Sequence, residues 1–466
     1  MDTELYELEK AIDEISRRAA NFGLDFFPMR FELCPADVLY TIGAYGMPTR
    51  FTHWSFGKAY FRLKTMYDFN LSRIYELVVN SNPCYAFLLE GNSLLQNKLV
   101  IAHVFAHCDF FKNNAWFSGT NRDMVETMSV NADRIREYEF LYGQPEVEKL
   151  LDAALAIQEH IDFHQIKKGK SKRKMRHKRH ARPESPYEDI WSIGAKEEKE
   201  DLEEQEKFPP CPDKDLIGFI MTHSHCLKDW QRELLSMVRD EMFYFWPQVE
   251  TKIMNEGWAA LWHARILREM DLSDEETLEF ARLHAGVLQP SKSKLNPYFL
   301  GMKIFEDIEK RWEYPSKEEQ IKYQRPGGEG RVKIFEVRET ENDQSFLRNY
   351  LTKDLVRDLD LYLFKKQGQQ WKVSDVEWET VRDGIVANLV NGGNPYLLVE
   401  DGDYKGNGHL FLKHRHEGID LDTYYLEKTL PYVFNLWGKT VHLETVLEGR
   451  SIIFSFDGTK NMRSSS

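Results

Sequence analysis

The stretch IAHVFAHCDFF, residues 101–111, places two histidines four positions apart inside an otherwise apolar run. The apolar spacing predicts a helix over residues 93–112. Positions i and i+4 of a helix point about 40° apart, so the rings of His103 and His107 lie on one side, one turn apart. A single cation can therefore bridge the two imidazoles.

A second helix is predicted around MNEGWAALWH, residues 254–263. Catalytic zinc usually takes three protein ligands and leaves a fourth position to water, so the histidine pair needs a partner. Glu256 is the strongest candidate, and His263, nearly two turns further on, falls on the same face. Glycine inside a helix costs about 1 kcal/mol relative to alanine and is tolerated where another backbone comes close. We therefore expect Gly257 to face the helix that carries the two histidines.

A purely structural interpretation competes with the metal site. Core histidines can be held by hydrogen-bond partners, and a glutamate can be paired with an arginine. Two ligand-type side chains on each of two helical faces favour the metal site over this alternative. We expect His103, His107 and Glu256 to bind zinc or a similar divalent ion, with His263 as a fourth ligand or a nearby acid.

The general base of such a site is not evident from the motif. In zinc peptidases with an HExxH motif, the glutamate between the histidines is the base. Val104 takes that position here and cannot accept a proton. A base must then come from elsewhere, within hydrogen-bond reach of a metal-bound water. Glu90, in FLLEGNS, and Glu241, in VRDEMFYF, are the candidates, although such carboxylates are more often helix caps or surface groups.

Composition limits the class of protein. The chain has 466 residues, of which 42% are hydrophobic, so at least two packed units are expected. A formal net charge of −13 argues against general nucleic-acid binding. The five cysteines form no CxxC pair, which favours a reducing compartment. With no secretory signal and no apolar span approaching about 18 residues, we expect a cytoplasmic protein without a transmembrane segment.

A charge-reversing segment interrupts the helical pattern. The basic run KKGKSKRKMRHKRH, residues 167–180, is followed by the acidic run KEEKEDLEEQEK, residues 196–207. Such runs bury little apolar surface, which predicts a mobile, solvated linker; a docking site for an acidic partner or an anionic membrane is the alternative. The predicted division is residues 1–164 and 214–325 for a helical domain, 165–213 for the linker and 326–466 for a smaller α+β module.

The expected fold class is therefore α+β, with a mainly helical N-terminal domain that contains a zincin-like HxxxH helix. Helices are predicted over residues 3–20, 56–77, 93–112, 121–141, 144–163, 225–245, 248–270, 274–287 and 297–312. Strands are predicted at RVKIFEV (331–337), LYLFKK (361–366), QWKVSD (370–375), TVHLETV (440–446) and SIIFSF (451–456), and a hairpin at YLLVED (396–401) and HLFLKH (409–414). Asn342 and Asp343 are placed to cap a helix, and Gly438 to end one.

Long stretches of the chain resemble the stage V sporulation protein R family, outside the linker. They are FGLDFFPMRFELCPADVLYTIGAYGMPTRFTHWSFGK (22–58), YELVVNSNPCYAFLLEGNSLLQNKLVIAHVFAHCDFFKNN (75–114), RDMVETMSVNADRIREYEFLYG (122–143), KIMNEGWAALWHARIL (252–267) and LNPYFLGMKIFEDIEKRW (295–312). The resemblance implies a cytoplasmic protein of the mother cell, required for the spore cortex, a modified peptidoglycan, and associated with a serine protein kinase. The HxxxH and NEGWAxxxxH phrases belong to the family, and NEGWA is similar to the third-ligand segment of some zinc peptidases.

Two functions follow as expectations. The first is a metal-dependent, hydrolase-like protein that cleaves an amide bond in a peptidoglycan precursor or a protein regulator. The second is a non-catalytic interaction protein that organises cortex-synthesis proteins, in which the charged linker would matter more than the histidines. A di-iron helical site ranks last, because the paired Glu-x-x-His motifs that it requires are not found.

Overall fold

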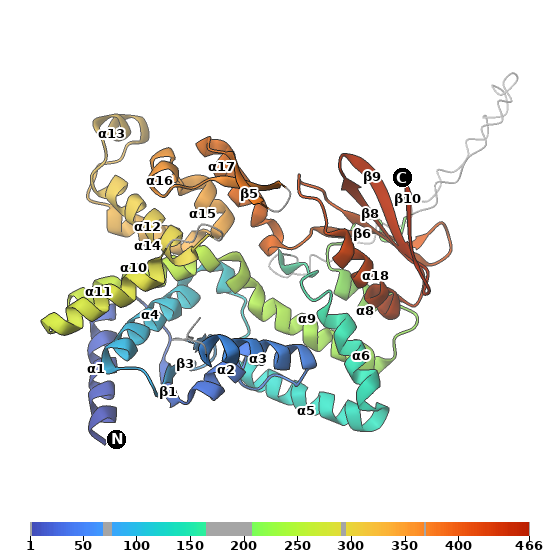
Figure 1. Ribbon diagram of the computed structural model, residues 1–466, viewed down its shortest axis with the longest axis horizontal. Coiled ribbons are helices and arrows are strands. Elements are labelled where there is room, and N and C mark those ends of the chain that lie inside the picture. The colour runs from blue at the N-terminus through green and yellow to red at the C-terminus, as the bar shows by residue number, and fades with distance from the viewer. Residues whose placement is uncertain (1, 69–76, 165–206, 290–294, 368–369, 466) are drawn as a thin grey trace, which may run out of the picture. The chain divides into compact units, whose positions relative to one another are not determined.

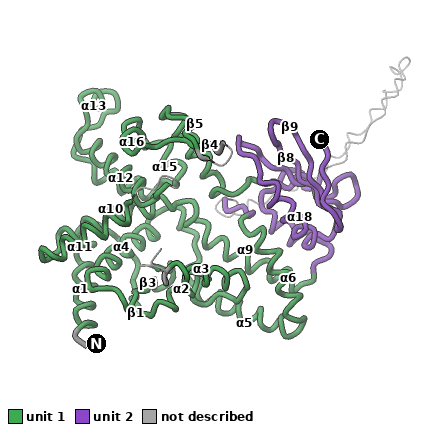
Figure 2. Tube along the Cα trace, viewed as in Figure 1, with its two compact units in different colours: residues 1–159, 228–396 green, residues 160–227, 397–466 purple. Residues whose placement is uncertain are grey.

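The computed structural model describes residues 2–68, 77–164, 207–289, 295–367 and 370–465. The chain divides into two units, coloured separately in Figure 2. Unit 1 comprises Met1–Glu159 and Lys228–Tyr396, and unit 2 comprises His160–Leu227 and Leu397–Ser466. Residues 326–396, predicted to begin the C-terminal module, thus belong to unit 1. Their helices bury Ile334, Val337 and Phe346 in the same core as the earlier helices, which explains the difference.

Unit 1 is mainly helical and is built around one largely buried helix. Helix α10 (Lys252–Arg268) packs against α4 (Leu94–Asn113) and α12 (Pro297–Glu313), as Figure 1 shows. Most residues of α10 are buried, and both Trp258 and Trp262 are fully buried, which places this helix in the interior of the unit. The other helices of the unit are α1 (Asp2–Asn21), α2 (Ala36–Tyr45), α3 (Trp54–Asp68), η1 (Ala115–Phe117), α5 (Met124–Tyr142), α6 (Gln144–Leu155), α9 (Asp229–Glu250), α11 (Asp274–Leu288), α13 (Lys317–Tyr323), α14 (Gly330–Thr340), α15 (Asp343–Tyr350), α16 (Lys353–Asp358), α17 (Trp378–Asn388) and η3 (Val390–Gly393).

The helix predicted over residues 93–112 is confirmed as α4. Its first turn is closed by a capping box, in which the Ser93 hydroxyl accepts from the backbone N–H of Gln96 and the Gln96 side chain accepts from the N–H of Ser93. Residues 99–111 are all buried. The two histidines therefore lie inside the core of unit 1, where a polar group requires a partner.

Gly257 allows a close helix contact, but with a different neighbour from the one predicted. A Cβ atom at Gly257 would overlap the backbone of Gly301 in α12, and a Cβ atom at Gly301 would overlap the carbonyl of Ile253. The close approach is therefore between α10 and α12, and the prediction that Gly257 faces α4 is wrong. Pressing α12 against one side of α10 leaves the Glu256 side free to face α4.

Two small sheets complete unit 1. Strands β1 (Met29–Cys34), β3 (Cys84–Leu89) and β2 (Leu77–Val79) form a sheet in the order β1-β3-β2. Strands β4 (Leu363–Gln367) and β5 (Gln370–Asp375), both predicted as strands, pair with each other. Leu77 is thus in a strand rather than at the end of the predicted helix 56–77, whose residues 69–76 lie outside the described part of the chain. The segment RVKIFEV, predicted as a strand, is helical in α14. Its buried residues Ile334 and Val337 are three apart, which is the spacing of a helix face.

Unit 2 contains a five-stranded sheet in the order β10-β9-β8-β7-β6. Its strands are β6 (Leu397–Tyr404), β7 (His409–His414), β8 (Val441–Leu447), β9 (Arg450–Phe456) and β10 (Asn461–Ser465), of which only the last was not predicted. Strands β7 and β8 are parallel and are joined through α18 (Thr423–Trp437), which packs on the sheet. Gly438 ends α18 with a φ of 85°, as predicted from its position.

The predicted linker differs from the structure at its C-terminal end. Its residues 165–206 lie outside the described part of the chain, but residues 207–213 contact the sheet of unit 2. The N–H of Asp213 donates to the carbonyl of Val399, and the N–H of Val399 donates back, at 3.0 and 2.7 Å. The ordered chain continues into α8 (Leu216–His223), which packs on β6. Among the described helices, none is long and apolar enough to cross a membrane.

Candidate metal centre

The three predicted ligands meet between α4 and α10. One ligand atom from each of His103, His107 and Glu256 lies within 4.8 Å of the others. The Oε2 atom of Glu256 is 3.4 Å from Nε2 of His107 and 3.8 Å from Nε2 of His103. The predicted convergence of two segments about 150 positions apart is therefore confirmed.

The separations between these atoms suit a small cation. Zinc binds imidazole nitrogen and carboxylate oxygen at about 2.1 Å, so two ligands of a tetrahedral ion lie about 3.4 Å from each other. The distance of 3.4 Å to His107 equals this value, and the distance of 3.8 Å to His103 is slightly longer. They are longer than an N–H···O hydrogen bond, which is about 2.7 to 3.2 Å. The residues present thus fit a divalent ion of the size of zinc.

The ring of His107 is oriented by the neighbour of Glu256. Nδ1 of His107 is 2.8 Å from Oδ1 of Asn255. An amide oxygen only accepts, so Nδ1 carries the proton, and in a neutral ring the lone pair of Nε2 faces Glu256. A metal-bound histidine generally donates its other N–H in this way. The ring of Phe111, one turn along α4, stacks on that of His107 with planes 14° apart.

His263 lies behind His103 and away from the carboxylate. Its Nδ1 is 2.7 Å from Nδ1 of His103, and its Nε2 is 2.8 Å from Nδ1 of His284 in α11. Both nitrogens of this fully buried ring therefore face other histidines. These contacts suit a residue that supports a ligand. They do not suit a fourth ligand, because both ring nitrogens of His263 already face other imidazoles.

The electrostatics of the centre favour an ionised carboxylate. Desolvation raises the pKa of Glu256, but the interactions with His103 and His107 outweigh it and hold the pKa well below the usual value. Burial lowers the pKa of His263 well below that of a free imidazole. The Glu256 side chain is 18% exposed and that of His103 is 2% exposed, but the Oε2 atom of Glu256 that faces the two imidazoles is itself buried.

The candidate bases Glu90 and Glu241 do not join this group. The carboxylate of Glu241 is buried and accepts a hydrogen bond of 2.7 Å from Nε of Arg50. Burial raises the pKa of Glu241, and Arg50 opposes that rise. Glu90 is exposed in the turn between β3 and α4, where its N–H donates to the carbonyl of Cys34. Their roles as bases stay predictions.

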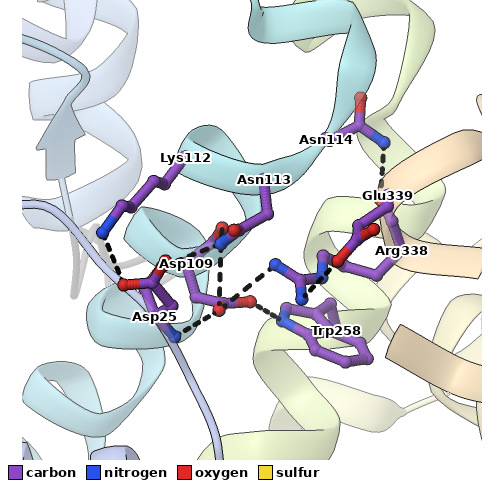
Figure 3. Close-up of polar contacts among 8 residues, drawn as sticks. All are labelled: Asp25, Asp109, Lys112, Asn113, Asn114, Trp258, Arg338 and Glu339. Atoms are coloured by element: carbon purple, nitrogen blue, oxygen red, sulfur yellow. Dashed lines mark hydrogen bonds and ion pairs between the residues drawn. The ribbon is translucent and has the colours of Figure 1, made fainter. Parts of the chain in front are cut away.

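A buried polar network joins α4 to α10 beside the centre (Figure 3). Asp109, two residues after His107, accepts from Nε1 of Trp258, two residues after Glu256, at 2.8 Å. The same carboxylate accepts from the backbone N–H of Asp25 at 2.7 Å and lies 3.4 Å from Nη1 of Arg338. Burial raises the pKa of Asp109 to about 6, and Arg338 opposes that rise. The local spacing did not predict the bond between Asp109 and α10, although an aspartate within an apolar helical run is a signal for a buried partner.

The start of α10 is fixed by a carboxylate from another helix. Oδ2 and Oδ1 of Asp343 accept from the backbone N–H groups of Ile253 and Met254, at 2.8 and 2.9 Å. The predicted cap of the helix after residue 342 is confirmed for Asn342, which caps α15. Asp343 instead caps the helix that carries Glu256. Desolvation raises the pKa of this fully buried group to about 7.

The fold and the centre together define a mainly helical α+β protein with a His-His-Glu group in its core. The chain matches the family described as "SpoVR like protein" over residues 2–394 and the "SpoVR-like C-terminal domain" over residues 395–448. It is 30% identical over 479 residues to "Uncharacterized protein YcgB" of Escherichia coli strain K12, covering 96% of this chain and 93% of the relative. No solved structure gives a significant match. The chain belongs to the SpoVR-like family, as its sequence resemblance predicted.

Proposed function

We propose that this protein is a metal-dependent, hydrolase-like enzyme, and that His103, His107 and Glu256 bind zinc. The observation that carries the proposal is the meeting of two imidazole nitrogens and one carboxylate oxygen within 4.8 Å. Polar groups inside a core are stable only when they are hydrogen-bonded, paired or bound to a metal. Two histidines and a glutamate are also the protein ligands of one class of catalytic zinc site.

A metal-free ion pair is the main alternative. In that arrangement a protonated imidazole would donate to Glu256, and charge-assisted hydrogen bonds of this kind are about 2.7 to 2.9 Å long. The separations of 3.4 and 3.8 Å are longer, and both imidazoles face the same oxygen. Oδ1 of Asn255 also accepts a hydrogen bond from the Nδ1–H group of His107, which leaves Nε2 of the neutral ring as an acceptor. These observations support a cation over a shared proton.

The residues around the candidate metal centre would have separate roles in catalysis. Bound zinc would lower the pKa of a water ligand to about 7 and polarise a carbonyl group. Asn255 orients the ring of His107 by accepting from its Nδ1–H group. Val104 stands where HExxH peptidases have their base, so Glu90 or Glu241 is proposed for proton transfer.

The biological role that we propose rests on family membership. It is the cleavage of an amide bond in a peptidoglycan precursor or a protein regulator during formation of the spore cortex, in the mother-cell cytoplasm and together with a serine protein kinase. In a spore-forming host that lacks the gene, we expect the wild type to restore the cortex. We expect the double variant His103→Ala, His107→Ala not to restore it.

Metal analysis of the purified full chain tests the core of the proposal. We expect about one zinc ion per chain in the wild type, and none above background in the double variant His103→Ala, His107→Ala. The double variant His225→Ala, His416→Ala is the control, because both residues belong to unit 2. It should retain its zinc. A wild type that stays metal-free after incubation with zinc and dialysis would overturn the proposal.

A further inference from the structure

A row of three histidines leads from the candidate metal centre toward the surface of unit 1. His103 contacts His263 at 2.7 Å, and His263 contacts His284 at 2.8 Å. The row begins in α4, passes through α10 and ends in α11. The first two rings are buried and the third is partly exposed. Neither of these two contacts involves the carboxylate of Glu256.

The contact between His103 and His263 joins two Nδ1 atoms, so one ring must donate and the other accept. If Nε2 of His103 is to offer a lone pair to an ion, Nδ1 of His103 must carry the proton. Nδ1 of His263 then accepts, and the proton of the neutral His263 ring lies on Nε2. That N–H points at Nδ1 of His284, 2.8 Å away. Each bond in the row thus has one consistent direction.

We propose that His263 and His284 are positioning residues for His103, which hold its ring so that Nε2 faces Glu256. The inference rests on the proposed function, because it assigns these residues to the same centre. Asn255 does the equivalent for His107 through its Oδ1 atom. Each histidine ligand would then have its own acceptor, one an amide and the other an imidazole.

The surroundings of the row agree with a neutral ring in its middle. His263 is fully buried, and both of its ring nitrogens face other imidazoles. A neutral imidazole can accept at one nitrogen and donate at the other, which is what the middle position of the row requires.

Zinc affinity of the full-length variants tests the proposal. The glutamine in His263→Gln can accept with its oxygen and donate with its nitrogen, whereas the leucine in His263→Leu can do neither. We expect His263→Leu to bind zinc about 10 to 100 times more weakly than the wild type, because the acceptors of metal-bound histidines contribute this much to affinity. We expect His263→Gln to stay within about threefold of the wild type. Affinity is measured by competition with a chromophoric chelator, and folding by circular dichroism.

The outcomes separate this inference from the proposed function. A wild type that binds no zinc overturns both. A wild type that binds zinc, with His263→Leu binding equally well or with both His263 variants equally weak, overturns only the positioning role. If neither His263 variant folds, His284→Leu and His284→Gln decide, because His284 is partly exposed. In that case we expect zinc affinity to fall about threefold to tenfold in His284→Leu and to stay near that of the wild type in His284→Gln. Exposed His225→Leu is the control and should bind as the wild type does.

Discussion

At the scale of single residues, the dipeptide Asn255-Glu256 explains how one helix contacts both ring nitrogens of His107. Adjacent residues on a helix diverge by about 100°, so they usually contact different neighbours. Here the ring of His107 lies between them, with Nδ1 at Asn255 and Nε2 facing Glu256. One residue orients the ring and the other supplies the negative charge.

Replacement of the carboxylate is the most direct change at this scale. Glu256→Gln keeps the size of the side chain but removes its charge, so the centre loses its one anionic ligand. Loss of the hydrogen-bond acceptor of a metal-bound histidine lowers metal affinity by up to roughly 100-fold. We expect the loss of the carboxylate to lower zinc affinity by more than this. Titration calorimetry against the wild type measures the change. Unchanged affinity would show that Glu256 does not bind the ion.

The buried cap Asp343 gives a pH dependence of stability. Its pKa is about 7 in the folded chain, compared with an ordinary value of 3.8. Between these values the folded state holds a proton that the unfolded state has released. The free energy of unfolding therefore falls as the pH rises from about 4 to about 7, by at most about 4 kcal/mol from this group.

Asp343→Asn removes the titrating group, and the comparison isolates its effect. Relative to this variant, we expect the wild type to lose stability as the pH rises from 4.5 to 7.5 in urea unfolding followed by tryptophan fluorescence. A difference between the two chains that stays constant across this range would contradict the assignment. Because the cap lies at the start of α10, the same variant also reports on the helix that carries Glu256.

At the scale of elements, α10 is positioned by a backbone contact on one side and by a side-chain hydrogen bond on another. Toward α12, the glycines 257 and 301 let the backbones touch. Toward α4, the hydrogen bond from Trp258 to Asp109 sets the position of one helix along the other. Since Trp258 and Asp109 each lie two residues beyond a metal-site residue, this bond also fixes the distance between the ligands.

Filling the α10–α12 contact should be costly. Gly257→Ala adds a methyl group where the backbone of Gly301 lies, and overpacking of this kind costs about 1 to 3 kcal/mol or more. Gly286→Ala in α11 is the matched control, because no atom lies within 4 Å of the added Cβ. We expect it to be neutral or to stabilise by up to about 1 kcal/mol. Thermal unfolding of both variants checks this, and equal melting temperatures would refute the close contact.

Removing the hydrogen bond between the two helices should also be measurable. Trp258→Phe keeps an aromatic ring but leaves the buried carboxylate of Asp109 without its indole donor. We expect a loss of about 1 to 3 kcal/mol in the free energy of unfolding. The double variant with Asp109→Asn should lose less than the sum of the two single variants, because the groups interact directly. Additive losses would mean that the bond contributes little.

The sequence predicted the long helices and the grouping of His103, His107 and Glu256, because both depend on local spacing. It could not predict which helix Gly257 faces, since a glycine indicates a close approach without identifying the neighbour. Strand β1 was missed because it is short and pairs with β3, about 50 residues further along. RVKIFEV has the composition of a strand, but it is helical because Ile334 and Val337 pack in the core from one face of a helix. His284 was missed because a single histidine on a helix has no pattern.

At the scale of the whole molecule, the metal centre belongs to unit 1 alone. His103, His107 and Glu256, with Asn255 and the supporting histidines 263 and 284, all lie within Met1–Glu159 and Lys228–Tyr396. The described residues of unit 2 contribute no atom to the group of His103, His107 and Glu256. Zinc binding and any role of the charged segment can therefore be separated by experiment.

Deletion of residues 167–206 performs this separation. The deletion removes the basic run and residues 196–206 of the acidic run, but it removes neither the candidate ligands nor residues 207–213, which contact β6. We expect the shortened chain to bind zinc with the affinity of the wild type, as measured by chelator competition. If the protein acts as an enzyme, the shortened chain should also restore cortex formation in a host that lacks the gene. Retained zinc binding with loss of cortex formation would instead favour an interaction protein, whose partner binds the charged segment.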